Sequence, residues 1–521
     1  MEDIRRKIEE IVTEVLEGSH YEGFAVKATK PKESSLGDYS VSVAMEIAKK
    51  EGTDPLALAR EIAGAIDNPL FLKVEAVKPG FVNFFLSPEF LAESVNAVLQ
   101  EGDDFGRIAV GSGRIQVEFV SANPTGPLTV GNGRGGPVGD VLGNVFKKAG
   151  YEVEKAYYVN DHGQQILALG HSVLKDTEAK YTGEYIEEIA PRIKETDPYL
   201  IGQAAAKIIL NEMIRQTVEK MNIRFDDWFS ETSLYDSQEV EAAIKLLEDK
   251  GYTYEAEGAT WFKSTAFGDE RDRVIIKKDG TKTYLAGDIA YHRNKFEKKK
   301  FDKVINIWGA DHFGDVPGLL AGVEAIGHKG QLEVILLQFV TVMKDNKPVK
   351  MSKRMGTVVL MDDLLDELSP DVIRFFFLQK SNNTHLNFDL NLAKEQSEKN
   401  PVYYVQYAHA RMASILRNAG GEKIKQLEDG SVLSHQKEME LMKQILRLPE
   451  IVGDCVRDYQ LQRLPQYAIE LATSFHQFYS ECHVLTDDEK LKEARLALVL
   501  AAKTALKNTL DILGVSAPEK M

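Results

Sequence analysis

The chain has 521 residues, more than one hydrophobic core usually serves, so we expect three or four domains. Asp and Glu number 80 against 64 Lys and Arg, and the net charge of -16 excludes a generally basic protein that coats nucleic acid. The two cysteines, Cys455 and Cys482, exclude a disulfide scaffold and a cysteine-based zinc finger, and they indicate a reducing compartment. No apolar run approaches the ~20 residues of a membrane span, so we expect a soluble, cytoplasmic protein.

The first hundred or so residues predict a small α+β domain. Apolar residues recur with helical spacing over residues 2–16, and two further helical patterns follow. Residues 71–86 alternate as two short strands that turn at Pro79-Gly80. A segment rich in Gly and Asp then suits a boundary, so we assign residues 1–107 to this domain.

From Arg114 the chain alternates between strand and helix patterns. A strand at 115–120, a loop rich in Gly and Pro, a helix at 138–150 and a strand at 152–161 form a βαβ unit, which predicts a parallel sheet. The alternation resumes near residue 301. We therefore expect an α/β fold, with a Rossmann-like domain at 108–375, a helix-rich insertion in it at about 162–280, and an all-α helical domain at 376–521.

Beyond about residue 370 the pattern is helical. Thr486 and Glu489 have the spacing of a capping box ahead of the last helix. A helical bundle of this length forms a domain of its own. The expected helices cover residues 402–416, 437–448, 462–479 and 489–513.

The loop after the first strand of the βαβ unit is a candidate nucleotide site. It reads VEFVSANPTGPLTVGNGRGGP over residues 117–137. The stretch from Gly131 to Gly136 matches the GxGxxG pattern of dinucleotide-binding folds, but ten residues separate it from the strand, whereas the first glycine of those folds ends the strand directly. Small residues let a nucleotide approach the backbone, and the following helix offers its N-terminus to a phosphate. A glycine-rich turn packed against the sheet is the alternative.

This loop resembles the first signature of class I aminoacyl-tRNA synthetases, usually written HIGH, in its long arginyl-tRNA synthetase form. Thr129 and Asn132 hold the positions of its two histidines; both donate hydrogen bonds, but neither becomes cationic. A Thr-x-Gly-Asn version is familiar in tryptophanyl members of the class. The resemblance assigns ATP binding and catalysis to Thr129, Gly131, Asn132 and Gly133, in a region that includes Ala122, Asn123, Pro124, Thr125, Gly126, Pro127, Leu128 and Val130.

A second motif lies roughly 220 residues downstream. Lys350, Met351, Ser352 and Lys353 match the KMSK loop of the same class. Two lysines that flank a serine can hold the pyrophosphate leaving group as negative charge develops on it. A basic surface cluster is the alternative, but the two signatures occur in the order that the class requires.

Five residues in segments that resemble arginyl-tRNA synthetases are candidates for binding arginine: Glu118, Asn123, Asn160, Tyr284 and Asp288. A guanidinium needs a carboxylate partner, preferably with two parallel hydrogen bonds. Tyr284 and Asp288 are four residues apart and share a face if their segment is helical. An unpaired carboxylate on a buried strand is costly, so a cationic ligand explains Glu118. The alternatives are a structural salt bridge for Glu118 and an exposed helix acid for Asp288.

Two Asp-His pairs end predicted strands, at the edge where an open α/β sheet binds ligands. Both segments resemble blocks of arginyl-tRNA synthetases, so we expect Asp161, His162, Asp311 and His312 near the adenylate. Capping of the strand ends is the alternative. An Asp-His pair could also hold zinc, but no third ligand stands at a suitable spacing, so we expect no structural metal.

The resemblance extends over essentially the whole chain. Residues 31–63 resemble the extra N-terminal domain of arginyl-tRNA synthetases, which meets the D-loop of tRNA, and residues 400–420 resemble the start of their anticodon-binding domain. Tyr403, Tyr407 and Arg411 combine rings and a cation that suit stacking on unpaired bases. The alternative is that the two tyrosines, four residues apart, belong to a helical core.

The resemblance implies an arginine–tRNA ligase of bacterial type. Such an enzyme activates L-arginine with ATP and Mg²⁺, releases pyrophosphate and transfers the arginyl group to tRNA(Arg), commonly with tRNA bound before activation. We expect no other cofactor, no editing step, no membrane association, and a monomer in the cytoplasm. The acidic net charge then requires that basic residues gather on one face. The alternative is an inactive synthetase paralogue that binds tRNA or nucleotide.

Overall fold

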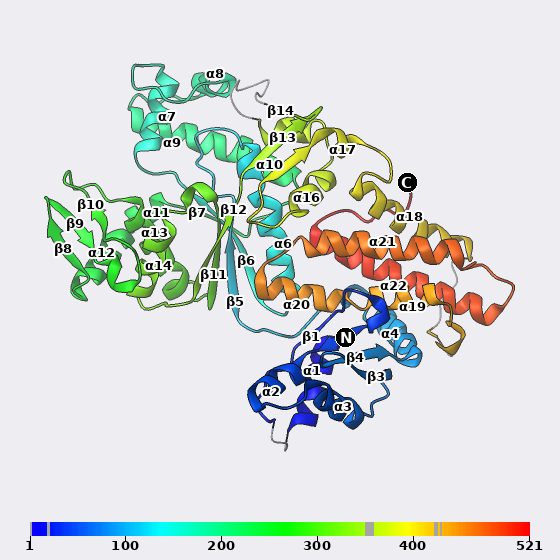
Figure 1. The fold of residues 1–521 in the computed structure, drawn as a ribbon. Helices are drawn as coiled ribbons and strands as arrows, with labels where there is room; N and C mark the ends of the chain where they lie inside the picture. Colours follow the sequence, from blue (N-terminus) through cyan, green and yellow to red (C-terminus); the bar gives the residue numbers. More distant parts are fainter. Residues whose placement is uncertain (1–2, 18–20, 350–358, 421–425, 428–429) are drawn as a thin grey trace.

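The structure is a computed structural model that describes residues 3–17, 21–349, 359–420, 426–427 and 430–521. It contains an N-terminal α+β domain, a central domain around a parallel sheet, and a C-terminal helical domain (Figure 1). In Figure 1 the blue N-terminal domain lies below the orange and red C-terminal helices. The green part of the central domain extends to the left, away from these helices. This architecture confirms the predicted fold class.

The N-terminal domain packs helices against an antiparallel sheet with the strand order β1-β2-β4-β3. The predicted hairpin is present as β3 and β4, with its turn at Pro79-Gly80. Helix α3 begins with Pro55 in its first turn, and the side chain of Asp54 accepts hydrogen bonds from two backbone N–H groups of that turn. The elements are α1 (Ile4–Leu16), β1 (Ala28–Thr29), β2 (Tyr39–Val41), α2 (Val43–Glu51), α3 (Pro55–Ala65), β3 (Phe71–Val77), β4 (Phe81–Leu86) and α4 (Pro88–Glu101).

The central sheet has five parallel strands in the order β12-β11-β5-β6-β7, which confirms the predicted parallel sheet. The chain starts at β5, moves outward through β6 and β7, and returns to the other side of β5 with β11 and β12. The order therefore reverses between β5 and β11, where open α/β sheets bind ligands at the carboxyl ends of their strands. The strands are β5 (Arg114–Glu118), β6 (Glu152–Val159), β7 (Asp227–Ser230), β11 (Lys303–Gly309) and β12 (Leu332–Leu337).

The span 162–280, expected as one helix-rich insertion, is divided by β7. Because β7 pairs with β6 in the main sheet, the segments before and after it are two insertions. The second carries a small antiparallel sheet, β8-β9-β10, beside its own hydrophobic core. A four-residue strand is too short to show a clear alternation in sequence. The other elements from β5 to β12 are α5 (Val130–Gly133), α6 (Gly135–Lys148), α7 (Gln164–Leu174), α8 (Glu184–Ile189), α9 (Pro198–Ile209), α10 (Arg215–Lys220), α11 (Thr232–Asp236), α12 (Glu239–Asp249), β8 (Thr253–Ala256), β9 (Ala259–Phe262), β10 (Arg273–Ile276), α13 (Tyr284–Arg293) and α14 (Val316–Ala325).

A fourth sheet, of β13, β14 and β15, follows the main sheet. Strand β15 pairs in parallel with β13, although it lies inside the span 376–521 that was expected to be helical throughout. The helical bundle therefore starts after β15. The elements of this connecting region are β13 (Val340–Lys344), β14 (Lys347–Pro348), α15 (Met361–Leu365), α16 (Pro370–Leu378), β15 (Leu386–Asp389) and α17 (Leu390–Lys394).

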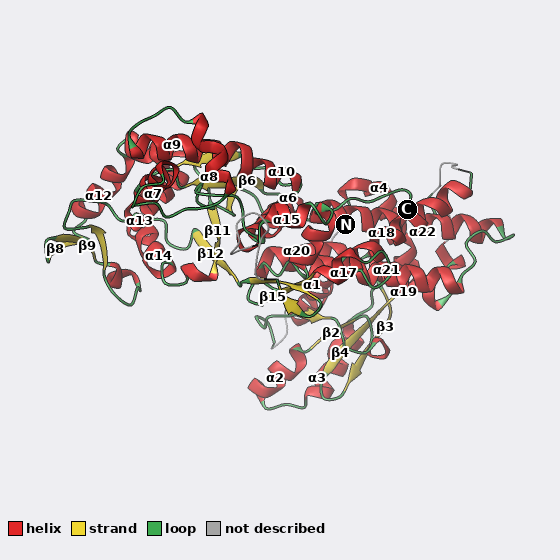
Figure 2. Cartoon of the chain, turned by 90° about the horizontal axis from the view of Figure 1, so that it is seen from above, coloured by secondary structure: helices red, strands yellow, loops and turns green. Residues whose placement is uncertain are grey.

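The C-terminal domain is a helical bundle in which α18, α21 and α22 pack side by side (Figures 1 and 2). Helix α20 was not expected from the sequence pattern. The side chain of Asp488 caps α22 by accepting a hydrogen bond from the Leu491 N–H, so the predicted capping box of Thr486 and Glu489 is wrong. The helices are α18 (Pro401–Asn418), α19 (Gln436–Ile445), α20 (Leu448–Asp458), α21 (Arg463–Glu481) and α22 (Glu489–Leu513).

Arg374 on α16 joins the central domain to the C-terminal domain. Its side chain is fully buried and pairs with Asp140 of α6 at 2.5 Å. The guanidinium also donates to the backbone carbonyls of Leu513, at the end of α22, and of Met221, after α10. Gly514 follows α22 at the same point, where a Cβ atom would lie 2.1 Å from the guanidinium. Four segments of the chain therefore meet at one buried cation.

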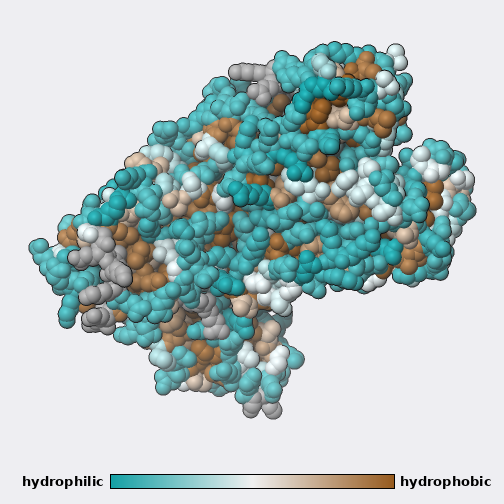
Figure 3. Space-filling view, turned by 180° about the vertical axis from the view of Figure 1, so that it is seen from behind, coloured by the Kyte–Doolittle hydropathy of each residue, from teal (hydrophilic) through white to brown (hydrophobic). Residues whose placement is uncertain are grey.

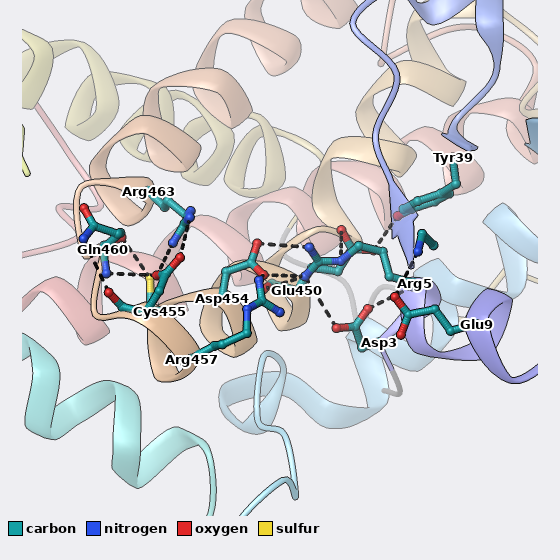
Figure 4. Close-up of polar contacts among 12 residues, drawn as sticks. Asp3, Arg5, Glu9, Tyr39, Glu450, Asp454, Cys455, Arg457, Gln460 and Arg463 are labelled. Atoms are coloured by element: carbon teal, nitrogen blue, oxygen red, sulfur yellow. Dashed lines mark hydrogen bonds and ion pairs between the residues drawn. The ribbon is translucent and has the colours of Figure 1, made fainter. Parts of the chain in front are cut away.

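The N-terminal domain docks on the C-terminal domain. Helix α4 contacts α19 and α22, and a polar cluster joins α1 to α20 (Figure 4). Arg5 donates to Asp454 at 3.1 Å and lies 3.5 Å from the carboxylate of Glu450. The Tyr39 hydroxyl donates to the same Glu450 carboxylate at 2.5 Å. The two outer domains therefore form one body through buried polar contacts.

Hydrophilic residues cover most of the face seen in Figure 3, and apolar residues form separate patches on it. The exposed large hydrophobic side chains are distributed over all three domains. In the part of the chain that the structure describes, no helix is long and apolar enough to cross a membrane.

We expect the substitution Arg374→Met to destabilise the fold by about 3–5 kcal/mol, because buried acceptors then lose their cationic donor. The matched control is Arg6→Met: Arg6 pairs with Glu10 on the exposed side of α1, and such a pair contributes about 1 kcal/mol or less. Urea-induced unfolding followed by circular dichroism measures both changes. Equal effects of the two substitutions would contradict the role of Arg374.

Candidate active site

The carboxyl ends of β5, β6 and β11 open into a cavity of about 800 Å³. Its other walls are the loop at 117–137, here called the signature loop, and the start of α13. It occupies the crevice where the strand order reverses, which is the expected ligand site of such a sheet. The predicted site residues that line it are Glu118, Ala122, Asn123, Thr129, Gly131, Asn132, Asn160, Tyr284, Asp288, Asp311 and His312.

The signature loop leaves β5 through a strained turn. Val120 and Ser121 have φ angles of 68° and 38°, a region that residues other than glycine rarely adopt. The Ser121 hydroxyl donates to the Glu118 carboxylate and accepts from the Tyr158 N–H, while the Asn160 side chain donates to the Ser121 carbonyl. Strain of this kind persists where the surroundings enforce it, and it is common at ligand sites.

Thr129 and Asn132 form a unit at the start of α5. The Thr129 hydroxyl oxygen accepts from the Asn132 backbone N–H at 3.3 Å, and the hydroxyl donates to the side-chain oxygen of Asn132 at 2.6 Å. The amide nitrogen of Asn132 thus keeps its two N–H donors for a ligand. Gly133 has no room for a side chain, because a Cβ atom would lie 2.2 Å from the sulfur of Met361. The loop therefore offers neutral donors in place of imidazolium.

The chain returns to the signature loop just after the second signature. Backbone hydrogen bonds join residues 128–130 to residues 359–361 on both sides of an antiparallel bridge between Thr129 and Leu360. The C-terminal flank of the second signature therefore lies directly beside the first. The second signature itself lies outside the described residues; it comprises Lys350, Met351, Ser352 and Lys353.

Asp288 contributes a carboxylate without a cationic partner to the wall of the cavity. It lies on α13, four residues after Tyr284, so the predicted helical arrangement of these two residues is confirmed. Within the described residues its carboxylate makes no hydrogen bond and no ion pair. Burial raises the pKa of Asp288 to about 7, and the negative charge of Glu118 adds to this effect. A cationic ligand would counteract both causes.

Glu118, by contrast, already has a cationic partner. It is buried at the end of β5, and its carboxylate lies 2.5 Å from the ammonium group of the fully buried Lys295. Lys295 also donates to Asn306 of β11, whose side chain bonds to His292. The premise that Glu118 is unpaired is therefore wrong. Lys295 balances its charge within the protein, which agrees with the alternative of a structural salt bridge.

The structure does not bring Asp161 and His162 into the cavity. The Asp161 carboxylate accepts a hydrogen bond from the Ser230 hydroxyl at 2.6 Å and one from the Thr232 N–H at 2.9 Å. His162 stacks on Tyr235, with ring centroids 3.8 Å apart. These contacts tie the end of β6 to the end of β7 and the start of α11, so strand-end capping accounts for Asp161.

Asp311 and His312 do reach the cavity. They form a short helical turn after β11, and both side chains are more than half exposed, at 64% and 56%. The imidazole of His312 lies 5.7 Å from the ring of Trp308, so an aromatic surface adjoins the pair. Within the described residues no group of three or more His, Cys, Asp or Glu side chains could hold a metal ion.

Three family models match successive parts of the chain. An arginyl-tRNA synthetase N-terminal domain matches residues 2–86, a class I (R) tRNA synthetase catalytic domain matches residues 176–412, and a DALR anticodon-binding domain matches residues 405–521. The arginine–tRNA ligase of Caldanaerobacter subterraneus subsp. tengcongensis is 41% identical over 99% of both chains. The chain belongs to the arginyl-tRNA synthetase family. This confirms the family and the enzyme class that the two signatures predicted.

Other relatives support the assignment of this chain to the arginyl-tRNA synthetase family. The arginine–tRNA ligase of Bacillus subtilis is 42% identical to it, over 94% of this chain and 93% of the relative. The Thermus thermophilus arginyl-tRNA synthetase has the same fold, with a TM-score of 0.81 at 22% identity, over 99% of this chain and 100% of the other. The fold therefore persists where most residues differ.

Two buried charged residues near the cavity of the synthetase were missed in the sequence. Lys295, the partner of Glu118, lies on a π-helical turn after α13, far from Glu118 in the sequence. Glu231 follows β7 and is buried; burial raises its pKa to about 8, and the charges of Asp288 and Asp161 add to this effect. An acidic residue at the end of a strand could have indicated Glu231 in the sequence, but only if β7 had been recognised as a strand.

Tyr403, Tyr407 and Arg411 lie together on α18 of the synthetase. The rings of Tyr403 and Tyr407 are nearly parallel, with centroids 6.3 Å apart. Arg411 donates to the Tyr407 hydroxyl at 2.8 Å and lies 4.4 Å from the ring centre of Tyr479 on α21. Tyr407 and Tyr479 are 38% and 36% exposed, so this cluster reaches the surface rather than filling the bundle core.

The raised pKa of Asp288 predicts a pH-dependent stability of the ligand-free synthetase. The folded-state pKa of about 7 exceeds the ordinary value of 3.8, so the ionised form disfavours folding and stability falls as the pH rises from about 4 to 7. We expect Asp288→Asn to be more stable than the wild type at pH 8, with the difference vanishing toward pH 4. Thermal unfolding across this range measures it.

The control for this prediction is Asp249→Asn, an exposed acid at the end of α12. It makes the same Asp-to-Asn change at an exposed position and is measured over the same pH range. A constant offset between Asp288→Asn and the wild type at all pH values would contradict a raised pKa.

Proposed function

We propose that this synthetase joins L-arginine to the 3′ end of tRNA(Arg) in two steps, with ATP bound as its Mg²⁺ complex. The first step forms arginyl-adenylate and releases pyrophosphate. The second transfers the arginyl group to the terminal ribose of the tRNA and releases AMP. The unpaired Asp288 carboxylate, in the same cavity as the phosphate-binding features of the signature loop, is the observation that carries this proposal.

In the activation step, the arginine carboxylate attacks the α-phosphorus, and the bond from this phosphorus to the oxygen of pyrophosphate breaks. No side chain serves as a covalent nucleophile; the site aligns the reactants and stabilises the negative charge. Asn132 and the N–H groups at the start of the helix contact the phosphates. Lys350 and Lys353 neutralise the departing pyrophosphate, and Asp311 and His312 contact the adenosine side.

Arginine is recognised through both of its ends. Asp288 pairs with the guanidinium, for which a carboxylate is the preferred partner, and Tyr284 packs beside it at the mouth of the cavity. Asn123 and Asn160 orient the α-amino and carboxylate end. Glu118 contributes indirectly, because its hydrogen bond maintains the strained turn that carries Asn123.

tRNA contacts the synthetase outside the cavity. The exposed rings of Tyr407 and its neighbours stack on unpaired anticodon bases, with the Arg411 cation beside them. The N-terminal domain meets the D-loop. Because the two outer domains are docked together, the surface for the anticodon and the surface for the D-loop keep a fixed distance from each other. We also propose that the synthetase acts as a monomer in the cytoplasm, a reducing compartment that suits its two buried free cysteines.

Arginine-dependent exchange of pyrophosphate into ATP tests the activation step. We expect exchange in the presence of tRNA(Arg), and we expect Asp288→Asn to raise the KM for arginine by about 100-fold or more, because the guanidinium loses its charged partner. The control Asp249→Asn is expected to retain wild-type kinetics.

The exchange assay is run with and without tRNA. Exchange only with tRNA supports activation that requires bound tRNA, whereas exchange in both reactions removes that requirement and keeps the enzyme. No exchange with retained tRNA binding favours the inactive paralogue. Loss of both activities would refute the proposed function.

We expect Tyr407→Ala to weaken tRNA binding by about 5- to 100-fold, because a base that stacks on an aromatic ring contributes about 1–3 kcal/mol. Tyr254→Ala is the matched control: Tyr254 is exposed to the same extent, at 37%, but lies on β8 at the opposite end of the molecule (Figure 1). Filter binding with labelled tRNA measures both. The assignment fails if the two variants bind tRNA equally well.

A further inference from the structure

Arg134 is a buried cation without an acidic partner. It lies within the signature loop, directly between α5 and α6, and is 1% exposed. The described residues include four buried Lys and Arg side chains, and three of them pair with a carboxylate, namely Lys155, Lys295 and Arg374. Arg134 forms no ion pair within the described residues. Its charge therefore has no counter-charge in this part of the protein.

Within the described residues, the guanidinium of Arg134 donates hydrogen bonds only to backbone carbonyls. Its Nη1 atom donates to the carbonyl of Gln338 at 2.5 Å and to that of Thr384 at 3.1 Å. Its Nη2 atom donates to the carbonyl of Ser381 at 3.1 Å, and its Nε atom is buried without a hydrogen-bond partner. Burial lowers the pKa of Arg134 to about 10, so the side chain keeps its positive charge at neutral pH.

The segment that Arg134 contacts does not require a charge to hold it in place. The Gln338 N–H donates to the Asn382 carbonyl at 3.0 Å, and the Leu386 N–H donates to the Phe339 carbonyl at 3.0 Å. Strands β13 and β15 continue this pairing. A neutral amide side chain can donate to the same carbonyls, and burying it costs less than burying a cation. A full positive charge at this position therefore indicates an anionic partner that is not part of the protein.

The charge of Arg134 lies behind the wall of the cavity. Gln338, whose carbonyl accepts from Arg134, lines the cavity, and so does Gly135, the next residue along the chain. Thr129 and Asn132 line it as well, and their side chains donate hydrogen bonds but carry no charge. The start of α5, which these two residues form, is where the phosphates of ATP are proposed to bind. A fixed positive charge is thus located next to the proposed phosphate site.

We propose that Arg134 is an electrostatic positioning residue for ATP, whose phosphates its buried and unpaired charge attracts to the start of α5. The inference rests on the proposed function and adds to it a residue that acts without touching the ligand. In a site shielded from water, a fixed charge acts over several ångströms, because the effective dielectric constant is about 20 rather than about 80. Arg134 thus supplies a positive charge that Thr129 and Asn132 do not.

Calorimetric titration with ATP and with adenosine tests this inference on the full-length wild type, Arg134→Gln and Arg134→Lys. Adenosine has the base and ribose of ATP but no phosphate, whereas Gln keeps N–H donors without the charge and Lys keeps the charge with a different donor geometry. We expect Arg134→Gln to weaken the binding of ATP by about 10- to 100-fold and that of adenosine by less than about 3-fold. Arg134→Lys is expected to bind both ligands within about 3-fold of the wild type.

The matched control is Arg447→Gln, which changes a half-buried arginine of the C-terminal domain that pairs with Glu470 and is expected to leave both affinities unchanged. Equal weakening of ATP and adenosine in Arg134→Gln indicates a structural role and overturns the inference, as does an unchanged affinity for ATP. If Arg134→Gln does not fold, Arg134→Lys decides: retained affinity for ATP supports the inference, and its loss overturns it. A wild type that binds no ATP defeats the proposed function first.

Discussion

The buried guanidinium of Arg374 is the constraint on which the arrangement of the domains depends. A cation shielded from water requires acceptors for its donors, and here they come from Asp140 on α6, from the end of α22 and from the segment after α10. The set is complete only when the central sheet, its first insertion and the C-terminal domain are docked. Helix α6 continues directly from the signature loop, so the same contact links the C-terminal domain to the loop that faces the cavity.

Two acidic side chains at or near the candidate active site differ from Arg374, because they lack partners of opposite charge. Arg374 and Lys295 are buried with acidic partners, whereas the half-buried Asp288 in the cavity wall and the buried Glu231 form no ion pair within the described residues. Burial and the neighbouring negative charges raise the pKa values of both acids, and on the proposed function the cationic side chain of arginine would relieve this cost. On the proposed function, this arrangement makes proofreading unnecessary, because an analogue that lacks the guanidinium would leave the cost of these acids uncompensated.

The N-terminal and C-terminal domains are docked together and carry the surfaces proposed to contact tRNA. The N-terminal domain contacts the helical bundle through α4 and through the cluster of Arg5, Tyr39 and Glu450, so both ends of the chain belong to one body (Figure 4). The exposed aromatic cluster belongs to α18 and α21 of the helical bundle, whereas the cavity is lined by residues of the central domain. On the proposed function, docking of the two outer domains places both surfaces that contact tRNA on one part of the molecule.

The sequence by itself determined the family, the parallel sheet, the hairpin and the long helices, because these follow from residue types repeated at short spacing. It also predicted that Tyr284 and Asp288 share a helix face, because these residues are only four positions apart, whereas the contact of Thr129 with Asn132 became visible in the structure. Only the tertiary structure decided which acids are free. Glu118 meets Lys295 across 177 positions, and Asp161 meets Ser230 across 69, so their pairing left no local pattern. Strand β7, and with it Glu231, is defined by its neighbour in the sheet. Whether a carboxylate is paired depends on neighbours that the fold brings together, and no spacing along the chain records them.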